Sequence, residues 1–72
     1  MDKPKYNQGD MLQRVALDPW EPAQLAVVVR VFDFHGFEHY ELRWTNTPGP
    51  SFYNDIRYID TSPNWRLYAR GQ

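Results

Sequence analysis

The densest group of possible metal ligands in the chain consists of two histidines and three carboxylates: Asp33, His35, Glu38, His39 and Glu41. A structural zinc site needs a tetrahedral set of ligands, usually with thiolates or several imidazoles. The chain has no cysteine, and His35 is expected in a turn, which would hold the two imidazoles in different backbone geometries. The sequence therefore predicts a solvated hairpin tip at this position, with no bound metal.

Other residue types that carry catalysis are present, but their spacing does not suit it. Asp55 and Asp60 could act as a pair of acids only in a cleft that separates their pKa values, and a chain of 72 residues has little depth for such a cleft. Ser51 and Ser62 lie in proline loops without a histidine base expected nearby. The chain also lacks a glycine-rich phosphate loop. We therefore expect a protein that is not an enzyme and has no cofactor.

Arginines and tyrosines alternate in the C-terminal part of the chain, a composition typical of surfaces that bind protein or nucleic acid. The formal net charge is −1, although residues 43–72 carry four arginines against two aspartates. A chain with this net charge exerts no long-range attraction on nucleic acid. We expect a protein partner, and the alternative is a small nucleic-acid-binding barrel that uses a C-terminal Arg/Tyr face.

Aromatic residues also lie in or beside two proline-containing loops. Trp20 lies in the loop 18–22, and Phe52 and Tyr53 follow the loop 46–51. Such rings are typical anchors of protein interfaces, but Trp20 and Phe52 could instead fold back and plug the ends of a barrel. The predicted partner-binding residues are Trp20, Phe52, Tyr53, Arg57, Tyr58, Arg66, Tyr68 and Arg70.

The elements that must position these residues are short strands. The length allows one core, so we expect a flexible N-terminal arm over residues 1–8 and a single β domain over 9–72. Twelve aromatic residues exceed what so small a core can enclose, so some are expected at the surface. The expected strands are Met11–Leu17, Leu25–Phe34, Phe37–Thr45, Phe52–Tyr53 and Trp65–Ala69, with residues 54–59 either extending the fourth strand or forming a helical turn.

Alternation along each strand predicts which side chains face the core. In the first strand, Met11, Val15 and Leu17 share one face. In the second, Leu25, Val27, Val29 and Val31 share one face, and Ala26, Val28, Arg30, Phe32 and Phe34 share the other. In the third, Tyr40, Leu42 and Trp44 oppose His39, Glu41 and Arg43, and Gly36 predicts the tight turn that joins these two strands in a hairpin.

Several short motifs resemble those of small SH3-like domains of bacterial and phage proteins. These motifs are the opening Lys5-Tyr6-Asn7-Gln8-Gly9-Asp10, the Val-rich second strand, the pattern Tyr40-x-Leu42-x-Trp44, and Tyr58-Ile59-Asp60. The resemblance covers residues 5–60 and implies an all-β, SH3-like antiparallel barrel or roll of four to five strands. It also implies a small phage or bacterial regulator that binds a larger host protein of the transcription or defence machinery. The acidic first loop and paired aromatics of the proline-binding SH3 domains are not in place.

No apolar run approaches the length of a membrane span, and the opening Met-Asp-Lys-Pro-Lys lacks the apolar segment of a secretory signal. The sequence accordingly predicts a cytoplasmic protein without a membrane partner or a small-molecule substrate. A further alternative is a structural subunit that associates with itself through an open sheet edge.

Overall fold

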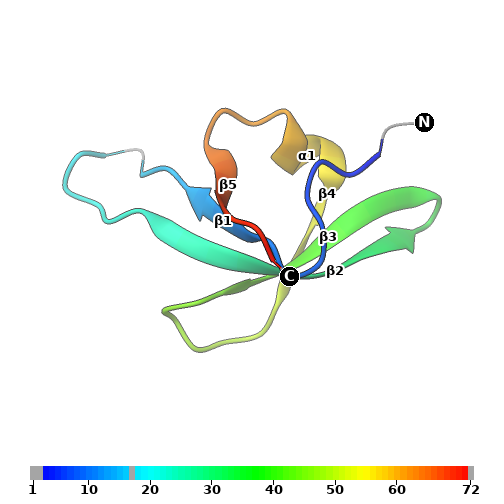
Figure 1. Ribbon diagram of the computed structural model, residues 1–72, viewed down its shortest axis with the longest axis horizontal. Helices are drawn as coiled ribbons and strands as arrows, with labels where there is room; N and C mark the ends of the chain where they lie inside the picture. Colours follow the sequence, from blue (N-terminus) through cyan, green and yellow to red (C-terminus); the bar gives the residue numbers. More distant parts are fainter. Residues whose placement is uncertain (1–2, 17, 72) are drawn as a thin grey trace.

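Five antiparallel strands form one sheet in the order β4-β3-β2-β1-β5 (Figure 1). The computed structural model describes residues 3–16 and 18–71. Its elements in chain order are β1 (Met11–Arg14), β2 (Gln24–Phe34), β3 (Phe37–Trp44), β4 (Phe52–Asp55), α1 (Ile56–Asp60) and β5 (Trp65–Ala69). The predicted all-β fold of antiparallel strands is confirmed. The sheet is not closed, so the architecture is an open roll with β4 and β5 as its edges.

The β2–β3 hairpin is the longest paired unit of the sheet, and its turn follows directly from the sequence. His35 and Gly36 both adopt positive φ angles, 54° and 85°, as the central residues of a two-residue type I′ turn do. The Asp33 side chain accepts a hydrogen bond from the Gly36 backbone N–H at 3.0 Å and so supports the turn. Pairing runs from Phe34 opposite Phe37 to Ala26 opposite Trp44. The predicted hairpin is confirmed.

A β-bulge between Val28 and Arg30 changes which side chains of β2 face the core. Ala26 and Val28 are fully buried before the bulge, but Val31 packs against the core after it. One extra residue in a strand reverses the alternation of every side chain beyond it. The prediction that Arg30 shares a face with Ala26 and Val28 is therefore wrong.

The core lies on the face of the sheet that α1 covers. Its buried members are Tyr6, Leu12, Ala26, Val28, Tyr40, Leu42, Ile56, Ile59 and Trp65. In β1 the buried residue is Leu12, so the predicted apolar face of Met11 and Val15 is wrong; Leu17 lies outside the described residues. The predicted inward face of β3 is confirmed, with Tyr40 and Leu42 fully buried and Trp44 packed against them.

The segment before β1 is held to the rest of the fold. Tyr6 is 3% exposed, and its backbone N–H donates to the Tyr40 hydroxyl at 3.1 Å. The backbone N–H of Lys5 donates to Asp60 at 3.1 Å. Residues 1–2 of the predicted arm lie outside the described residues. Within the predicted arm, Tyr6 is thus buried, whereas Lys5, Asn7 and Gln8 are exposed.

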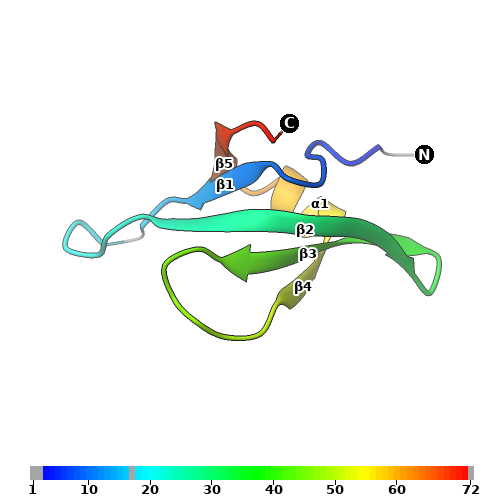
Figure 2. The same ribbon diagram turned by 60° about the horizontal axis from the view of Figure 1, so that its bottom comes forward.

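Asp10 joins the two ends of the described chain. This buried carboxylate accepts hydrogen bonds from the backbone N–H groups of Asn7 and Gly71, each at 2.9 Å. The hydrogen bond from Asn7 is the main reason that the pKa of Asp10 lies below its usual range. A side-chain carbon added to Gly71 would overlap the backbone of Gly9, so the two segments cross in close contact. In Figures 1 and 2, the red C-terminal end accordingly lies beside the blue segment that precedes β1.

Candidate functional site

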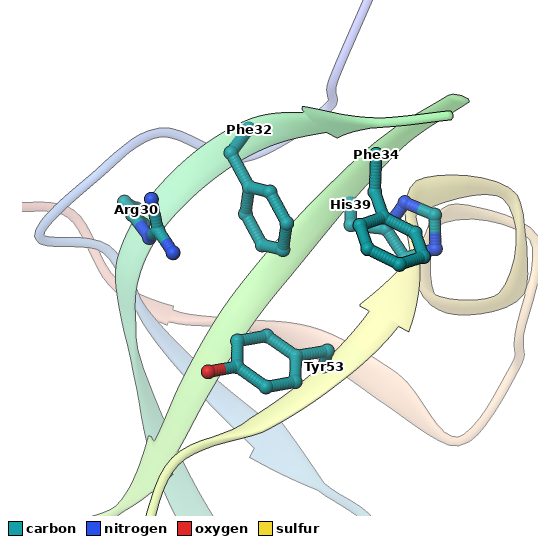
Figure 3. A pocket seen from close by; sticks show the side chains of 5 residues that line it. All are labelled: Arg30, Phe32, Phe34, His39 and Tyr53. Atoms are coloured by element: carbon teal, nitrogen blue, oxygen red, sulfur yellow. The ribbon is translucent and has the colours of Figure 1, made fainter. Parts of the chain in front are cut away.

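Five side chains from three strands gather on the face of the sheet opposite the core (Figure 3). Arg30, Phe32 and Phe34 come from β2, His39 from β3 and Tyr53 from β4. They line an open hollow of about 450 Å³, and we call these five residues the aromatic face. Phe34 is 54% exposed and Tyr53 is 57% exposed, so the rings present a large part of their surface to solvent.

The bulge in β2 builds this arrangement. Because alternation reverses after Val28, Phe32 and Phe34 turn away from the core and come level with the outward residues of β3. Phe32 pairs with His39 across the strands, and His39 in turn pairs with Asp55 of β4. The side chains of the aromatic face therefore come from three neighbouring strands that are hydrogen-bonded to one another.

The rings within the aromatic face touch one another in tilted and edge-on arrangements. The centroids of Phe32 and Tyr53 lie 5.6 Å apart with the ring planes at 81°. The centroid of the His39 ring lies 5.9 Å from that of Phe32 and 5.6 Å from that of Phe34. Edge-to-face aromatic pairs of this kind are favourable.

Arg30 closes one end of the hollow. Its Nε donates to Oε1 of Glu41 at 2.6 Å, and its guanidinium carbon lies 4.4 Å from the centre of the Phe32 ring. The hydrogen bond between Arg30 and Glu41 raises the pKa of the arginine and lowers that of the glutamate. The Arg30 side chain is 55% exposed and that of Glu41 only 15%. The cation is therefore the accessible member of this pair.

A second group of an arginine, a carboxylate and a phenylalanine lies near the start of α1 and consists of Arg57, Asp55 and Phe37. The Arg57 guanidinium donates to both oxygens of Asp55, at 3.1 and 2.8 Å, and its central carbon lies 5.1 Å from the centre of the Phe37 ring. Hydrogen bonds from Arg57 lower the pKa of Asp55 to about 2. Here too the arginine is more exposed, 62% against 27% for the carboxylate.

The aromatic face is suited to contact through rings and guanidinium groups. Nδ1 of His39 lies 3.0 Å from the carbonyl oxygen of Phe37, and the ring of His35 packs edge-on against Phe34 in the turn. The two histidines are thus held in different settings. In the described part of the chain, no three histidine, aspartate or glutamate side chains gather in a way that could hold a metal ion.

The predicted partner-binding residues do not all reach this face. Tyr53 lines the hollow, and Arg57 lies over Phe37 beside it. Phe52 points to the core side, where it stacks on Trp44 with a centroid distance of 5.0 Å, so the inward alternative is correct for Phe52. Trp20 is 79% exposed and plugs nothing. Figures 1 and 2 show its cyan loop at the opposite end of the molecule from the hairpin tip.

The remaining predicted residues lie on α1, on β5 and just after it. Tyr58 and Tyr68 are exposed, whereas Arg66 donates to the Gln13 side chain at 2.8 Å. Nη1 of Arg70 lies 3.8 Å from Oδ2 of Asp10. Arg66 and Arg70 therefore contact different neighbours. None of the four residues Tyr58, Arg66, Tyr68 and Arg70 lines the hollow.

Comparisons of this chain with family models, with curated proteins and with solved structures found no match. The predicted resemblance to SH3-like domains therefore stays a prediction. Among residues 3–16 and 18–71, no helix has the length and apolar character needed to cross a membrane.

Four members of the aromatic face were not predicted as site residues: Arg30, Phe32, Phe34 and His39. The sequence does contain a partial signal, because His39 alternates with Tyr40 and was expected to point away from the core. The hairpin register that follows from the Gly36 turn also places Phe32 opposite His39. The bulge in β2 was not predicted, because the valines on both faces of this strand do not indicate where its alternation reverses.

Proposed function

We propose that this protein is a non-catalytic binding module that docks a protein partner on its aromatic face. The observation that carries the proposal is the exposure of Phe34 and Tyr53, each more than half exposed on a face of the sheet that the core does not use. Aromatic residues and arginine are enriched in the centres of protein interfaces. This face combines four rings with an arginine around one hollow.

The size of the face fits one side of a modest interface. A large aromatic side chain has on the order of 150–250 Å² to bury. Covering the half-exposed rings of the face and the stem of Arg30 would remove several hundred Å² from water, against about 800 Å² for one side of a standard interface. The aromatic face would therefore form the centre of a contact whose polar rim extends onto neighbouring strands.

The nucleic-acid alternative has weaker support. Binding to a phosphate backbone gains its free energy by releasing counterions through many available cations. Arg30 and Arg57 are each paired with a carboxylate, Arg70 lies near Asp10, and the net charge of the chain is −1. A mobility-shift titration at low salt tests the alternative, because that condition most favours such binding.

The finer description of the partner rests on the sequence. The resemblance to small SH3-like domains supports a phage or bacterial regulator that acts on a larger host protein. The lack of cysteine agrees with a reducing compartment such as the cytoplasm. Both statements stay predictions.

A pull-down with paired variants tests the proposal. Phe34→Ala combined with Tyr53→Ala should reduce retention of the partner at least tenfold, because two exposed anchors at the centre of the interface are removed. The matched control is Tyr58→Ala combined with Tyr68→Ala, which removes rings of similar exposure that do not line the hollow. The control should retain the partner, and circular dichroism should show both proteins folded.

The reverse result would count against the aromatic face. If the Tyr58 and Tyr68 variant loses the partner while the Phe34 and Tyr53 variant keeps it, the binding surface lies on α1 and β5. That surface carries Tyr58, Arg66 and Tyr68, which are among the residues predicted from the sequence.

A further inference from the structure

We propose that two copies of this chain associate by pairing the free edges of their β2 strands, antiparallel and centred on Phe32. This contact lies at an edge of the sheet and does not depend on a partner for the aromatic face. It follows from the backbone groups that β2 leaves unpaired, from a sequence that can pair with itself, and from the rings that such pairing brings together.

β2 is longer than the strand that pairs with it on one side. β1 pairs with residues 24–27 only, whereas β3 pairs with β2 as far as Phe34. The backbone N–H of Val28 donates to Asp10 at 2.9 Å, and the Val28 carbonyl accepts from Gly9 at 2.8 Å. Among the described residues, no strand or backbone hydrogen bond continues this side of β2 beyond Val28. Figure 2 shows the end of β2 that leads to the hairpin turn extending past β1.

The hairpin geometry identifies the backbone groups on this edge. Phe34 and Phe37 flank a two-residue turn, and residues in these positions exchange backbone hydrogen bonds. Such pairs alternate along a hairpin with pairs that are not hydrogen-bonded, so Phe32 also directs its backbone groups toward β3. Val31 and Asp33 direct theirs the other way. Each therefore presents an N–H donor and a C=O acceptor at the free edge.

The free edge lacks the features that commonly prevent strands from pairing between molecules, such as proline, lysine or a bulge. Residues 30–34 are Arg-Val-Phe-Asp-Phe, in which the two charges cancel. The bulge of β2 lies before this stretch. The carboxylate of Asp33 accepts the backbone N–H of Gly36 in the turn. This edge can therefore extend its ladder with another strand.

A second copy supplies a matching strand. Antiparallel pairing about a two-fold axis at Phe32 sets Val31 opposite Asp33 of the second copy, and the reverse. The backbone groups of both residues face the free edge, so each pair can exchange both of its hydrogen bonds. An axis at Asp33 would oppose two carboxylates, which is unfavourable. An axis at Val31 would set Asp33 opposite Val29, the bulged residue.

The same register joins the exposed rings of the two copies. Phe32 lies opposite Phe32 of the second copy, and aromatic pairs that face each other across strands stabilise a sheet. Arg30 lies opposite Phe34 of the second copy, a ring that is 54% exposed in one chain. A guanidinium beside an aromatic ring is a favourable contact. Because opposed residues of antiparallel strands project to the same side, the two aromatic faces form one continuous surface.

Single-cysteine variants test the register, because the chain has no cysteine of its own. Phe32→Cys places two thiols in a pair that is not hydrogen-bonded, with Cα atoms about 4.5 Å apart, a separation that a disulfide can span. With oxidised glutathione, this variant should form a disulfide-linked dimer many times faster than Tyr68→Cys. Tyr68 is the matched control, because it is an exposed ring on the end strand β5.

Charge variants test the association without a covalent bond. In analytical ultracentrifugation, the apparent mass of the unaltered chain should rise with concentration toward that of two chains. Phe32→Glu and Phe32→Lys should each remain monomeric, because like charges would face each other across the two-fold axis. An equimolar mixture of these two variants should associate again, and Tyr68→Glu should associate as the unaltered chain does. Well-dispersed amide spectra show that each variant is folded.

Several results would overturn the inference. One is an unaltered chain that stays monomeric at millimolar concentration, and another is association that Phe32→Glu leaves unchanged. Faster disulfide formation at position 68 than at position 32 would place the contact on β5. If the unaltered chain associates but the mixture of Glu and Lys variants does not, the copies do not meet at Phe32. None of these results affects the pull-down that tests the proposed function.

Discussion

Leu42→Ala is expected to lower the free energy of unfolding by about 2–5 kcal/mol, the range for truncation of a buried leucine. Leu42 is fully buried in the middle of β3, between Val28 of β2 and Phe52 of β4 in the sheet register. Domains are typically stable by about 0.05–0.15 kcal/mol per residue, which gives roughly 4–11 kcal/mol for this chain. Loss of this one side chain could thus remove half of the total stability.

Urea unfolding followed by tryptophan fluorescence measures the effect. The control is Leu25→Ala, the same change at a position of β2 that is only partly buried and does not belong to the core cluster. Leu25→Ala should lower the free energy of unfolding by clearly less than Leu42→Ala does. Equal losses for the two variants would mean that the core does not lie on the face of β3 that carries Leu42.

Tyr40→Phe is expected to lower the free energy of unfolding by about 1–3 kcal/mol through the loss of a single oxygen atom. The Tyr40 hydroxyl accepts from the buried backbone N–H of Tyr6 and donates to Asp60 at 2.7 Å. Burial, together with the hydrogen bond to Asp60, raises the pKa of this tyrosine above its usual range. Without the hydroxyl, the Tyr6 N–H keeps its place in the core but loses its acceptor.

This hydroxyl links three parts of the chain, so its loss should have a local signature. Amide hydrogen exchange of Tyr6 should accelerate together with the loss of stability, and Tyr58→Phe, at a 63% exposed ring, should change neither quantity. If Tyr40→Phe leaves both stability and exchange at Tyr6 unaltered, the hydroxyl does not hold the N-terminal segment.

Local alternation and turn chemistry in the sequence predicted most of the sheet. Gly36 identified the hairpin turn, and the outward and inward residues of β3 were predicted correctly. Residues 54–59 had two alternatives, and both hold in part, since β4 continues to Asp55 and α1 begins at Ile56. Asp55 is the last residue of β4 and the N-cap residue of α1, and its side chain accepts a hydrogen bond from the backbone N–H of Arg57.

The misjudged features depend on contacts between distant parts of the chain. Tyr6 was expected to be the first residue of the N-terminal arm to dock, but the hydrogen bond from its backbone N–H to the Tyr40 hydroxyl, 34 residues away, was not predicted. Leu12 rather than Met11 faces the core because the register between β1 and β2 sets Leu12 opposite the buried Ala26. Periodicity within one strand carries no information about either partner.

The bulge in β2 explains why the candidate site was only partly found. Sequence alone placed Arg30, Phe32 and Phe34 on the same side as Ala26 and Val28, which face the core in the structure. The bulge sends these three side chains to the opposite face, beside His39 and Tyr53. A single local irregularity thus both completes the core with Val31 and creates the exposed aromatic face.

The most direct measurement for the role of the aromatic face is site-specific photocrosslinking. A benzophenone amino acid placed at Phe34 should form one discrete covalent adduct with the partner in the native cell. The same group at Tyr68, a ring of similar exposure on β5, should form none. An adduct at position 68 together with none at position 34 would contradict binding through the aromatic face.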